Sequence, residues 1–321
     1  MSEERKSIVI DTLGSDKGPA AILEGAKMVL EDNPDIEVIL VGDEEFIKSQ
    51  GLPQERVKII NAPETITNYD NAAEAFYKKP NVSVFKALEE CAKNENTIGL
   101  ISSGNTGALM VGTIRYLLNE KRTRPALAAI LPNTQGSFTC LVDTGASIDV
   151  GPHQLVEFAH LGTDFMRNLY KIDSPRVGLL SNGSEPTKGN KLVKETHKLL
   201  DVEEGINFIG NVEGNKALNG LCDVLVCDGF AGNQVLKNTE GMAINIITEI
   251  MKFGKMTGNE ETTKKLAGYL MARYDFESLG AGIMLGAKKL VMKCRGSSGP
   301  MAIKNVAKIL INVSNNKTFY E

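Results

Sequence analysis

Short apolar runs that end in small polar residues alternate with longer segments of helical period along almost all of the 321 residues. The runs are too continuously apolar to leave one face in water, which is typical of parallel strands covered by helices on both sides. The alternation therefore predicts an α/β fold with a doubly wound, mainly parallel sheet. The expected strands are residues 7–10, 37–41, 57–61, 97–102, 126–131, 138–143, 176–180, 207–210, 223–227 and 290–294. The expected helices are residues 19–32, 81–94, 105–119, 152–170, 189–200, 233–254 and 300–312.

No linker, repeat of fixed period or low-complexity tract divides the chain. We therefore expect residues 1–321 to form a single α/β domain. The least regular segment is 254–280, where Gly254 and Gly258 interrupt a helical pattern of mixed charge. It is expected to form a helical hairpin that projects from the sheet.

The composition limits the classes of partner. Hydrophobic residues make up 42% and charged residues 24% of the chain, and the net charge is −4 with Lys and Arg spread evenly. This profile predicts a globular protein without the basic patch of a nucleic-acid-binding surface. No apolar stretch approaches the roughly 20 residues of a membrane span, and the N-terminus has no signal-peptide pattern. A cytoplasmic protein that binds small molecules or other proteins is expected.

The chain has five cysteines, which lie in apolar surroundings and show no CxxC spacing. Reduced core thiols explain that pattern better than a disulfide framework or a zinc site. They are Cys91, Cys140, Cys222, Cys227 and Cys294.

Residues 102–108, "SSGNTGA", are one of several glycine-bearing turns that follow an apolar strand and precede a helix. The others are "DTLGSDKGP", "DTGAS", "SNGSEPTKGN", "CDGFAGN" and "CRGSSGP". In an open parallel sheet such turns share the carboxyl edge, where ligands bind. Glycines let backbone N–H groups approach a ligand, and helix starts favour negative charge, so these turns predict an anion site without metal or cofactor.

Other readings of the same loops remain open. Glycine-rich turns are common in any doubly wound protein, and the chain has neither a GxGxxG fingerprint nor a GxSxG elbow. The "GSEPTKG" stretch is not a P-loop, because Lys188 precedes its glycine. Asp11, Asp143 and Asp228 each end an expected strand, and their carboxylates could cap helices or close loops as well as act in catalysis.

Seven motifs, taken together and in order, resemble the PlsX family of bacterial phosphate acyltransferases. They are "SSGNTGALM", "RTRPALAAILP", "DTGASID", "PRVGLLSNGSEPTKGNKLVKE", "NFIGNVEG", "DVLVCDGFAGNQVLKNTEG" and "RGSSGPMAIKN". The likeness runs from about residue 8 to residue 312. It implies a fold related to phosphotransacetylase and isocitrate dehydrogenase, and transfer of an acyl group from acyl carrier protein, or another thioester carrier, to inorganic phosphate. It also implies a homodimer and no metal, and long-chain products would favour a peripheral membrane contact through residues 254–280.

The resemblance implies roles for particular residues. Lys188 would hold and orient phosphate; the alternative is a solvated lysine at a helix start. Asn233 would donate a hydrogen bond to phosphate or to the oxyanion; the alternative is a helix cap. The remaining residues implied for phosphate or substrate binding are Asp11, Ser103, Gly104, Asn105, Thr106, Asp143, Asn182, Gly232, Arg295, Gly296, Ser297 and Ser298.

Some positions depart from the family pattern. The opening motif is "DTLGSD" where Asp-Ala-Met-Gly-Gly-Asp is usual, "LGAGIMLG" replaces the usual Gly-Gly-Ala-Pro-Leu-Leu-Gly, and Arg295 stands in place of a histidine. The stretch "TLGSDKG" and a cysteine just before the C-terminal Gly-Ser-Ser are similar to the acetyl-phosphate-forming subunit of glycine reductase component C. In that branch Cys294 could carry an acetyl group before phosphate attacks it, whereas the alternative is a buried strand thiol. A third reading is a non-catalytic, phosphate-binding regulatory subunit.

Overall fold

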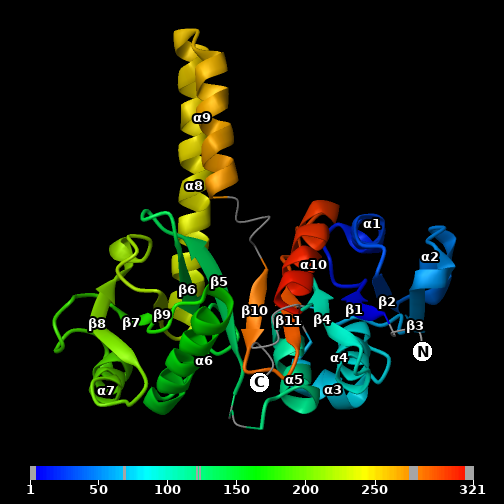
Figure 1. Ribbon diagram of the computed structural model, residues 1–321, viewed down its shortest axis with the longest axis horizontal. Helices are drawn as coiled ribbons and strands as arrows, with labels where there is room; N and C mark the ends of the chain where they lie inside the picture. The colour runs from blue at the N-terminus through cyan, green and yellow to red at the C-terminus, as the bar shows by residue number, and fades with distance from the viewer. Residues whose placement is uncertain (1–4, 68–69, 121, 123, 275–280, 315–321) are drawn as a thin grey trace. The chain divides into compact units, whose positions relative to one another are not determined.

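The computed structural model describes residues 5–67, 70–120, 122, 124–274 and 281–314 (Figure 1). By its internal packing the chain divides into two compact units, although no linker in the sequence marks a boundary. Unit 1 contains Met1–Ala128, Arg167–Lys171 and Ala281–Glu321, and unit 2 contains Ala129–Met166 and Ile172–Gly280.

The sheet of unit 1 has the strand order β3-β2-β1-β4-β11-β10, followed by the first residues of β5. Its parallel strands are β1 (Lys6–Asp11), β2 (Ile36–Gly42), β3 (Val57–Asn61), β4 (Thr97–Ser102) and β11 (Leu290–Lys293). The short β10 (Gly282–Leu285) runs antiparallel to both β11 and the start of β5 (Ala126–Pro132). The mainly parallel sheet that the apolar runs predict is therefore confirmed, with β10 as the exception.

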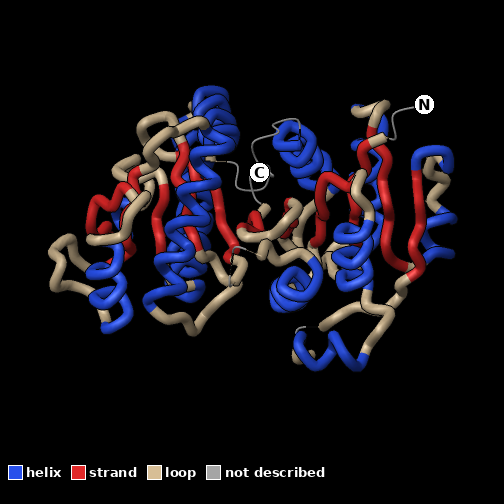
Figure 2. The backbone as a smooth tube through the Cα atoms, turned by 60° about the horizontal axis from the view of Figure 1, so that its bottom comes forward, coloured by secondary structure: helices blue, strands red, loops and turns tan. Residues whose placement is uncertain are grey.

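Helices cover both faces of the unit 1 sheet (Figure 2). They are α1 (Gly18–Asp32), α2 (Glu44–Ser49), α3 (Ala72–Lys78), α4 (Ser83–Lys93), α5 (Thr106–Tyr116) and α10 (Pro300–Ser314). Helix α1 packs on α10, and α4 packs on α5. The connection from β1 to β2 and the connection from β3 to β4 run in opposite directions along the sheet, so right-handed crossovers place α1 and α4 on opposite faces. The chain direction thus switches between β1 and β4, which is where open α/β sheets bind ligands.

The sheet of unit 2 has the order β5-β6-β9-β7-β8, beginning with the second part of β5. Strands β6 (Phe138–Val142), β9 (Val224–Val226), β7 (Arg176–Ser181) and β8 (Asn207–Glu213) are parallel to one another. Strands β5 and β6 are neighbours joined only by the turn 133–137, so they form an antiparallel hairpin. Each unit consequently has its own parallel run and its own carboxyl edge.

Alternate residues of β9 show how the layers of unit 2 pack. Val224 contacts α6 (Pro152–Tyr170) at Gly162, whereas Leu225 belongs to a buried cluster that Val235 of α8 (Gly229–Thr257) covers. Since successive side chains of a strand point to opposite faces, α6 and α8 cover opposite faces of this sheet. Helix α7 (Lys191–Leu200) packs on β7 and β8.

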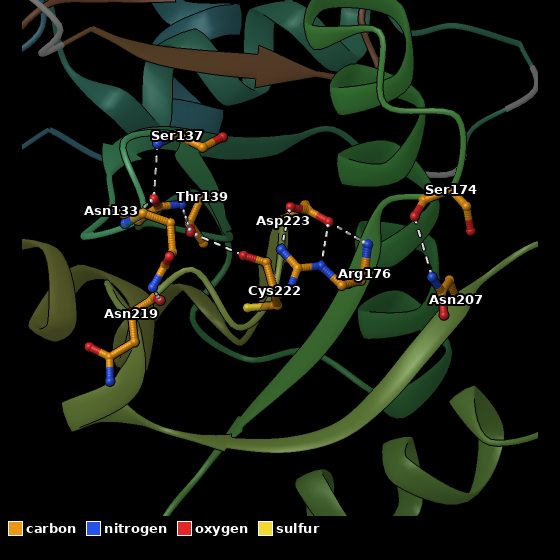
Figure 3. Close-up of polar contacts among 10 residues, drawn as sticks. Asn133, Ser137, Thr139, Ser174, Arg176, Asn207, Asn219, Cys222 and Asp223 are labelled. Atoms are coloured by element: carbon orange, nitrogen blue, oxygen red, sulfur yellow. Dashed lines mark hydrogen bonds and ion pairs between the residues drawn. The ribbon is translucent and has the colours of Figure 1, made fainter.

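Polar contacts join the strands of unit 2 at their amino ends (Figure 3). The Arg176 guanidinium donates to both carboxylate oxygens of Asp223 at 3.1 and 2.9 Å, and the Arg176 backbone N–H donates to the same carboxylate at 2.8 Å. Thr139 Oγ1 donates to the carbonyl oxygen of Cys222 at 3.1 Å. These bonds hold the starts of β6, β7 and the segment before β9 in register.

Helix α8 continues far beyond the sheet of unit 2, and α9 (Glu260–Arg273) returns along it as an antiparallel partner (Figure 1). Gly258 makes the turn with φ of 68°, a left-handed conformation that glycine adopts without strain. A projecting helical hairpin is therefore present, but it pairs α8 with α9 and begins before the expected residue 254, because Gly254 lies inside α8 and only Gly258 ends the helix. Residues 275–280 of the expected segment lie outside the described residues.

Candidate functional site at two carboxyl edges

Asp11 closes β1 at the switch point of unit 1 and is 1% exposed. Its carboxylate accepts a hydrogen bond from Ser102 Oγ, at the end of β4, at 2.7 Å and one from the backbone N–H of Leu13 at 3.2 Å. Burial raises the pKa of Asp11 to about 6, although the Ser102 and Ser83 hydroxyls and the Lys293 charge favour the ionised form. Asp11 is thus shielded from solvent and joins the end of β4 to the loop after β1.

The loop after β4 contains the "SSGNTGA" turn. Ser103 and Gly104 are buried, and Asn105 Oδ1 caps α5 by accepting from the Ala108 backbone N–H at 3.0 Å. Gly14, with φ of 82°, approaches so closely that a Cβ there would lie 2.6 Å from the α-carbon of Gly104. The β1 and β4 loops therefore contact each other through glycine backbone. Thr106 is the first residue of α5 and is half-buried.

The loop after β11 lies against the same two loops. The backbone N–H of Cys294 donates to Ser102 O at 2.8 Å, and the carbonyl oxygen of Gly296 accepts from the Asp16 backbone N–H at 2.8 Å and from Ser15 Oγ at 3.1 Å. Arg295 is half-buried, Ser297 is exposed and Ser298 is buried. The structure thus brings ten of the predicted residues together in unit 1: Asp11, Ser103, Gly104, Asn105, Thr106, Cys294, Arg295, Gly296, Ser297 and Ser298.

Cys294 does not have the environment of a nucleophile. Its side chain is 1% exposed, and burial raises the pKa of the thiol to about 12. Because the thiolate is the reactive species, only a very small fraction of Cys294 is reactive at neutral pH. Of the two readings left open by the sequence, the structure favours the buried strand thiol over an acyl carrier.

The carboxyl edge of unit 2 holds the remaining predicted residues. Asp143, at the end of β6, is buried, and its Oδ1 accepts from the backbone N–H groups of Gly145 at 3.0 Å and Ala146 at 3.1 Å. Asn233 Nδ2 donates to Thr144 O at 3.1 Å, so the α8 residue and the β6 loop are directly joined. Gly232 permits this contact, because a Cβ there would overlap the carbonyl oxygen of Asp143.

Asn233 does not cap α8, which corrects one of the two alternatives for it. The helix begins at Gly229, and Asp228 caps it by accepting from the Ala231 backbone N–H at 2.7 Å. Asn233 is therefore one turn inside the helix, half-buried beside the β6 loop. The helix-capping alternative that the sequence left open for Asp228 is the one the structure supports.

The loop between β7 and α7 carries Asn182 and Lys188, both exposed. Asn182 Oδ1 accepts from the backbone N–H of Gly189 at 2.9 Å, which closes the loop. Helix α7 begins at Lys191 with Asn190 as its cap, so Lys188 precedes the helix instead of standing in its first turn. The alternative of a solvated lysine at a helix start therefore applies only to the loop before the helix, because Lys188 precedes the N-cap.

A cavity of about 340 Å³ opens between that loop and the start of α8. Ser181, Asn182 and Gly189 line it from the loop, and Asp228 and Ala231 line it from the helix. Ser181 Oγ is shielded from solvent and has no hydrogen-bond partner among the described residues. Leu155, Leu179, Leu180 and Val193 also line it, so the cavity at the unit 2 edge has mainly apolar walls with a few polar groups.

The predicted residues form two groups, one at the carboxyl edge of each unit. Asp143, Asn182, Lys188, Gly232 and Asn233 are in unit 2, and the other ten are in unit 1. Within each unit these residues lie at one carboxyl edge, and the β5–β6 hairpin stands between the two parallel runs. Ser102, which donates to Asp11, and Lys293, which ends the strand "LVMK", lie at the same edge of unit 1 and were not among the predicted site residues.

A model of the family described as "Fatty acid synthesis protein" matches residues 6–318. A protein named phosphate acyltransferase from Halothermothrix orenii is 40% identical over 317 residues, covering 94% of this chain and 93% of that protein. A phosphate acyltransferase from Brevibacillus brevis is 38% identical over 310 residues, covering 93% and 90%.

Solved structures share the fold. A phosphotransacetylase from Streptococcus pyogenes superimposes with a TM-score of 0.62 at 15% identity, covering 97% of this chain and 94% of that one. A branched-chain phosphotransacylase from Enterococcus faecalis gives 0.60 at 14% identity, covering 97% and 99%. At such identity the likeness concerns the fold alone, whereas the family match and the relatives above extend over nearly the whole sequence. The chain therefore belongs to the fatty acid synthesis protein family, the PlsX family that its loop motifs resemble.

Proposed function

We propose that this protein is an acyltransferase that converts an acyl thioester and inorganic phosphate into acyl phosphate and a free thiol. The observation that carries the proposal is membership, over residues 6–318, of a family whose relatives are named phosphate acyltransferase. The two loop edges support it, since each presents backbone N–H groups and polar side chains of the kind that bind anions. In this proposal both units work as one catalytic domain.

The reaction needs positioning more than a strong base. A phosphate oxygen attacks the thioester carbonyl carbon, the carbonyl oxygen becomes an oxyanion, and the C–S bond breaks with departure of the thiolate. Phosphate is already an anion at neutral pH, so orienting it and stabilising the oxyanion lower the barrier. Hydrogen-bond donors without a metal are sufficient for both tasks.

Lys188 and Asn233 are the residues proposed to act directly. Lys188 is exposed and directly precedes Gly189, which lines the unit 2 cavity, so its ammonium is proposed to hold phosphate charge there without the cost of a buried cation. The Asn233 amide is fixed by its bond to Thr144 O and keeps a second N–H for phosphate or the oxyanion. The remaining residues of the two edges are proposed to supply further donors.

Direct attack by phosphate is preferred to a covalent route through Cys294. The thiol is buried with a pKa of about 12, so it forms little thiolate at neutral pH. In this proposal Cys294→Ala retains acyl phosphate formation, and no acyl adduct forms at this position. Mass spectrometry of the wild-type protein after incubation with acetyl and palmitoyl donors checks this, and an acylated Cys294 would favour the glycine reductase branch.

The acyl donor is proposed to be acyl carrier protein or another thioester carrier, and two copies of the chain are proposed to form a homodimer. Helices α8 and α9 expose large apolar side chains, which is unusual for an unpartnered surface. They are Met242, Ile244, Ile246, Phe253, Met256, Leu266, Tyr269 and Met271. Pairing of two hairpins would bury this surface.

Peripheral membrane contact is a separate proposal for the same hairpin. None of the helices in the described part of the chain combines the length and the low charge needed to cross a bilayer. Acyl phosphates with long chains partition into membranes, so a cytoplasmic enzyme that meets the bilayer surface would release its product there. Sedimentation with liposomes tests the contact, and a protein that stays in the supernatant contradicts it.

The activity is tested by incubating the protein with phosphate and with acyl carrier protein thioesters or acetyl thioesters. Acyl phosphate is trapped with hydroxylamine, and the free thiol is measured in the same reaction. Equal amounts of hydroxamate and thiol are expected, both dependent on phosphate. Absence of product with every acyl length contradicts the proposal, and phosphate binding without product would point to the non-catalytic regulatory subunit.

A further inference from the structure

Lys293 is the last residue of β11 and is paired with Ser102 at the end of β4. It therefore stands at the carboxyl edge of unit 1, one strand from the switch point between β1 and β4. The residues before it, Leu290 to Met292, are buried, as suits a central strand. Lysines are seldom buried, so apolar packing does not explain an ammonium group at the end of this central strand.

The contacts of the Lys293 ammonium are backbone carbonyls. Nζ donates to Ser103 O at 3.3 Å and to the carbonyl oxygen of Cys294. An ammonium has three N–H donors, so one remains after these two bonds among the described residues. No carboxylate of the described residues is in ion-pair contact with it, and Asp11 and Asp16 act on it only through space.

Burial opposes the charge of Lys293. Loss of solvent lowers the pKa of this ammonium, and the nearby Cys294, Asp11 and Asp16 favour the charged form only in part. A partly buried cation without a contacting anion is unfavourable unless a ligand supplies the missing charge. The environment of the Lys293 ammonium therefore favours the binding of an anion.

A second unsatisfied group lies in the neighbouring loop, after β4. Ser103 is 2% exposed, and its Oγ has no hydrogen-bond partner among the described residues, while its own carbonyl accepts from Lys293. Helix α5 begins at Thr106, and α10 begins at Pro300 after the β11 loop. Both helix starts add positive potential at this edge, which again favours an anion.

We propose that Lys293 is the anchoring cation of a phosphoryl-anion site at the carboxyl edge of unit 1, with Ser103 Oγ as a second donor. The inference rests on the proposed phosphate chemistry. It extends that chemistry, because Lys293 is not among the residues for which the family resemblance implies phosphate binding. The phosphoryl group is either inorganic phosphate or the phosphate of the carrier's pantetheine arm. Both offer the anionic oxygens that an ammonium and a hydroxyl bind.

The test compares Lys293→Met with Lys289→Met. Lys289 stands just before the other end of β11, is also half-buried, donates to a backbone carbonyl (Asn94 O, 2.6 Å), and burial lowers its pKa too. Binding of inorganic phosphate and of pantetheine 4′-phosphate is measured by calorimetry, and thermal shifts are recorded with each ligand. Loss of one charge-assisted bond predicts binding about 10- to 100-fold weaker for Lys293→Met and within about twofold of wild type for Lys289→Met.

The pattern of loss distinguishes the two sources of the anion. Weakened binding of phosphate alone assigns the site to the nucleophile, and weakened binding of pantetheine 4′-phosphate alone assigns it to the carrier arm. If Lys293→Met does not fold, Lys293→Gln keeps a donor for the two carbonyls and removes the charge. Lys293→Arg, which keeps the charge, should restore part of the affinity.

The inference and the proposed function can fail separately. Unchanged affinity for both ligands in folded Lys293→Met or Lys293→Gln overturns the inference, even when acyl phosphate is formed. Loss of affinity confined to the Lys293 variants supports it, even when no donor is turned over. Equal losses of affinity in Lys289→Met would mean that removing either half-buried lysine weakens binding only through folding. That result also overturns the inference.

Discussion

At the scale of single residues, Asp11 makes the stability of the protein depend on pH. Its pKa is about 6 in the folded protein and 3.8 in the unfolded reference, so the folded state binds the proton more tightly. The contribution of Asp11 to stability is therefore fully present below about pH 4, is lost as the pH rises from about 4 to about 6, and stays absent above that range. The full shift corresponds to roughly 3 kcal/mol.

Asp11→Asn tests this directly. The amide has nearly the same shape and no charge, so it removes the titration while Ser102 keeps a partner. The unfolding free energy of the variant relative to wild type should increase by roughly 3 kcal/mol between pH 4 and pH 7. Denaturant unfolding at several pH values measures the difference, and a constant difference over that range would mean that Asp11 does not titrate there.

Lys188 offers a sharper test of the proposed chemistry. Lys188→Ala should lower kcat/KM for phosphate by about 10- to 100-fold, because one charge-assisted contact is lost from the transition state. Lys191→Ala is the matched control, since Lys191 is exposed on the same loop-to-helix segment and pairs only loosely with Glu195 at 3.9 Å. Hydroxamate formation at varied phosphate measures both, and equal effects of the two variants would remove the special role of Lys188.

The sequence predicted those candidate site residues that lie at or just after the end of a strand. Asp11, Asn105 and Asp143 were located because an apolar run followed by a small polar residue marks a strand end. Lys293 was not predicted, since a lysine beside Cys294 and Arg295 reads as one more surface charge. Only the structure shows that its ammonium is half-buried against two carbonyls.

At the scale of secondary-structure elements, the pair of Arg176 and Asp223 holds β7 to the segment before β9 (Figure 3). Arg176→Met leaves the carboxylate, whose side chain is 10% exposed, with one remaining backbone donor. We expect a loss of about 2 kcal/mol in stability, less than for a fully buried pair because the arginine is 45% exposed. Activity per folded molecule should not change, because the pair lies at the amino ends of the strands.

Thermal unfolding of Arg176→Met measures that loss. Lys252→Met is the control, because its ion pair with Glu249 is exposed on both sides and should contribute almost nothing. A melting temperature equal to that of wild type for both variants would show that the Asp223 carboxylate is solvated without its arginine.

The long, strongly periodic elements were predicted, and so were the short apolar strands β9 and β11, whereas β10, α2 and α3 were not. Helices α1, α4 and α6 lie within a few residues of their expected ranges, because each buries one continuous apolar stripe. The strand β10 has only four residues and begins with glycine, and α3 has seven residues between loops. Elements that short have too few periods to separate them from turns, and tertiary contacts form them.

At the scale of the whole molecule, the division into two units could not be predicted from the sequence, because no linker marks a boundary and tertiary packing defines it. The β5–β6 hairpin did have a signal in the sequence. The expected strands 126–131 and 138–143 are separated by residues 132–137, a connection too short for a parallel crossover. The prediction of one mainly parallel sheet did not use that signal.

The exposed apolar side chains of α8 and α9 give the last prediction. If two copies pair through the hairpins, a charge at the centre of that surface must be buried without a partner, which strongly opposes association. Phe253, 60% exposed, is in the projecting part of α8, and Phe253→Glu should convert the dimer into monomers. The control is Val202→Glu, which charges an apolar residue that is 77% exposed after α7 and away from the hairpin.

Light scattering coupled to gel filtration measures the mass of each variant over a range of protein concentrations. We expect the mass of two chains for wild type and Val202→Glu, and of one chain for Phe253→Glu. A monomeric wild type that sediments with liposomes would instead assign the apolar surface to a membrane. A dimer that persists in Phe253→Glu would place the contact between copies elsewhere on the chain, because a buried, unpaired glutamate at the hairpin could not be tolerated there.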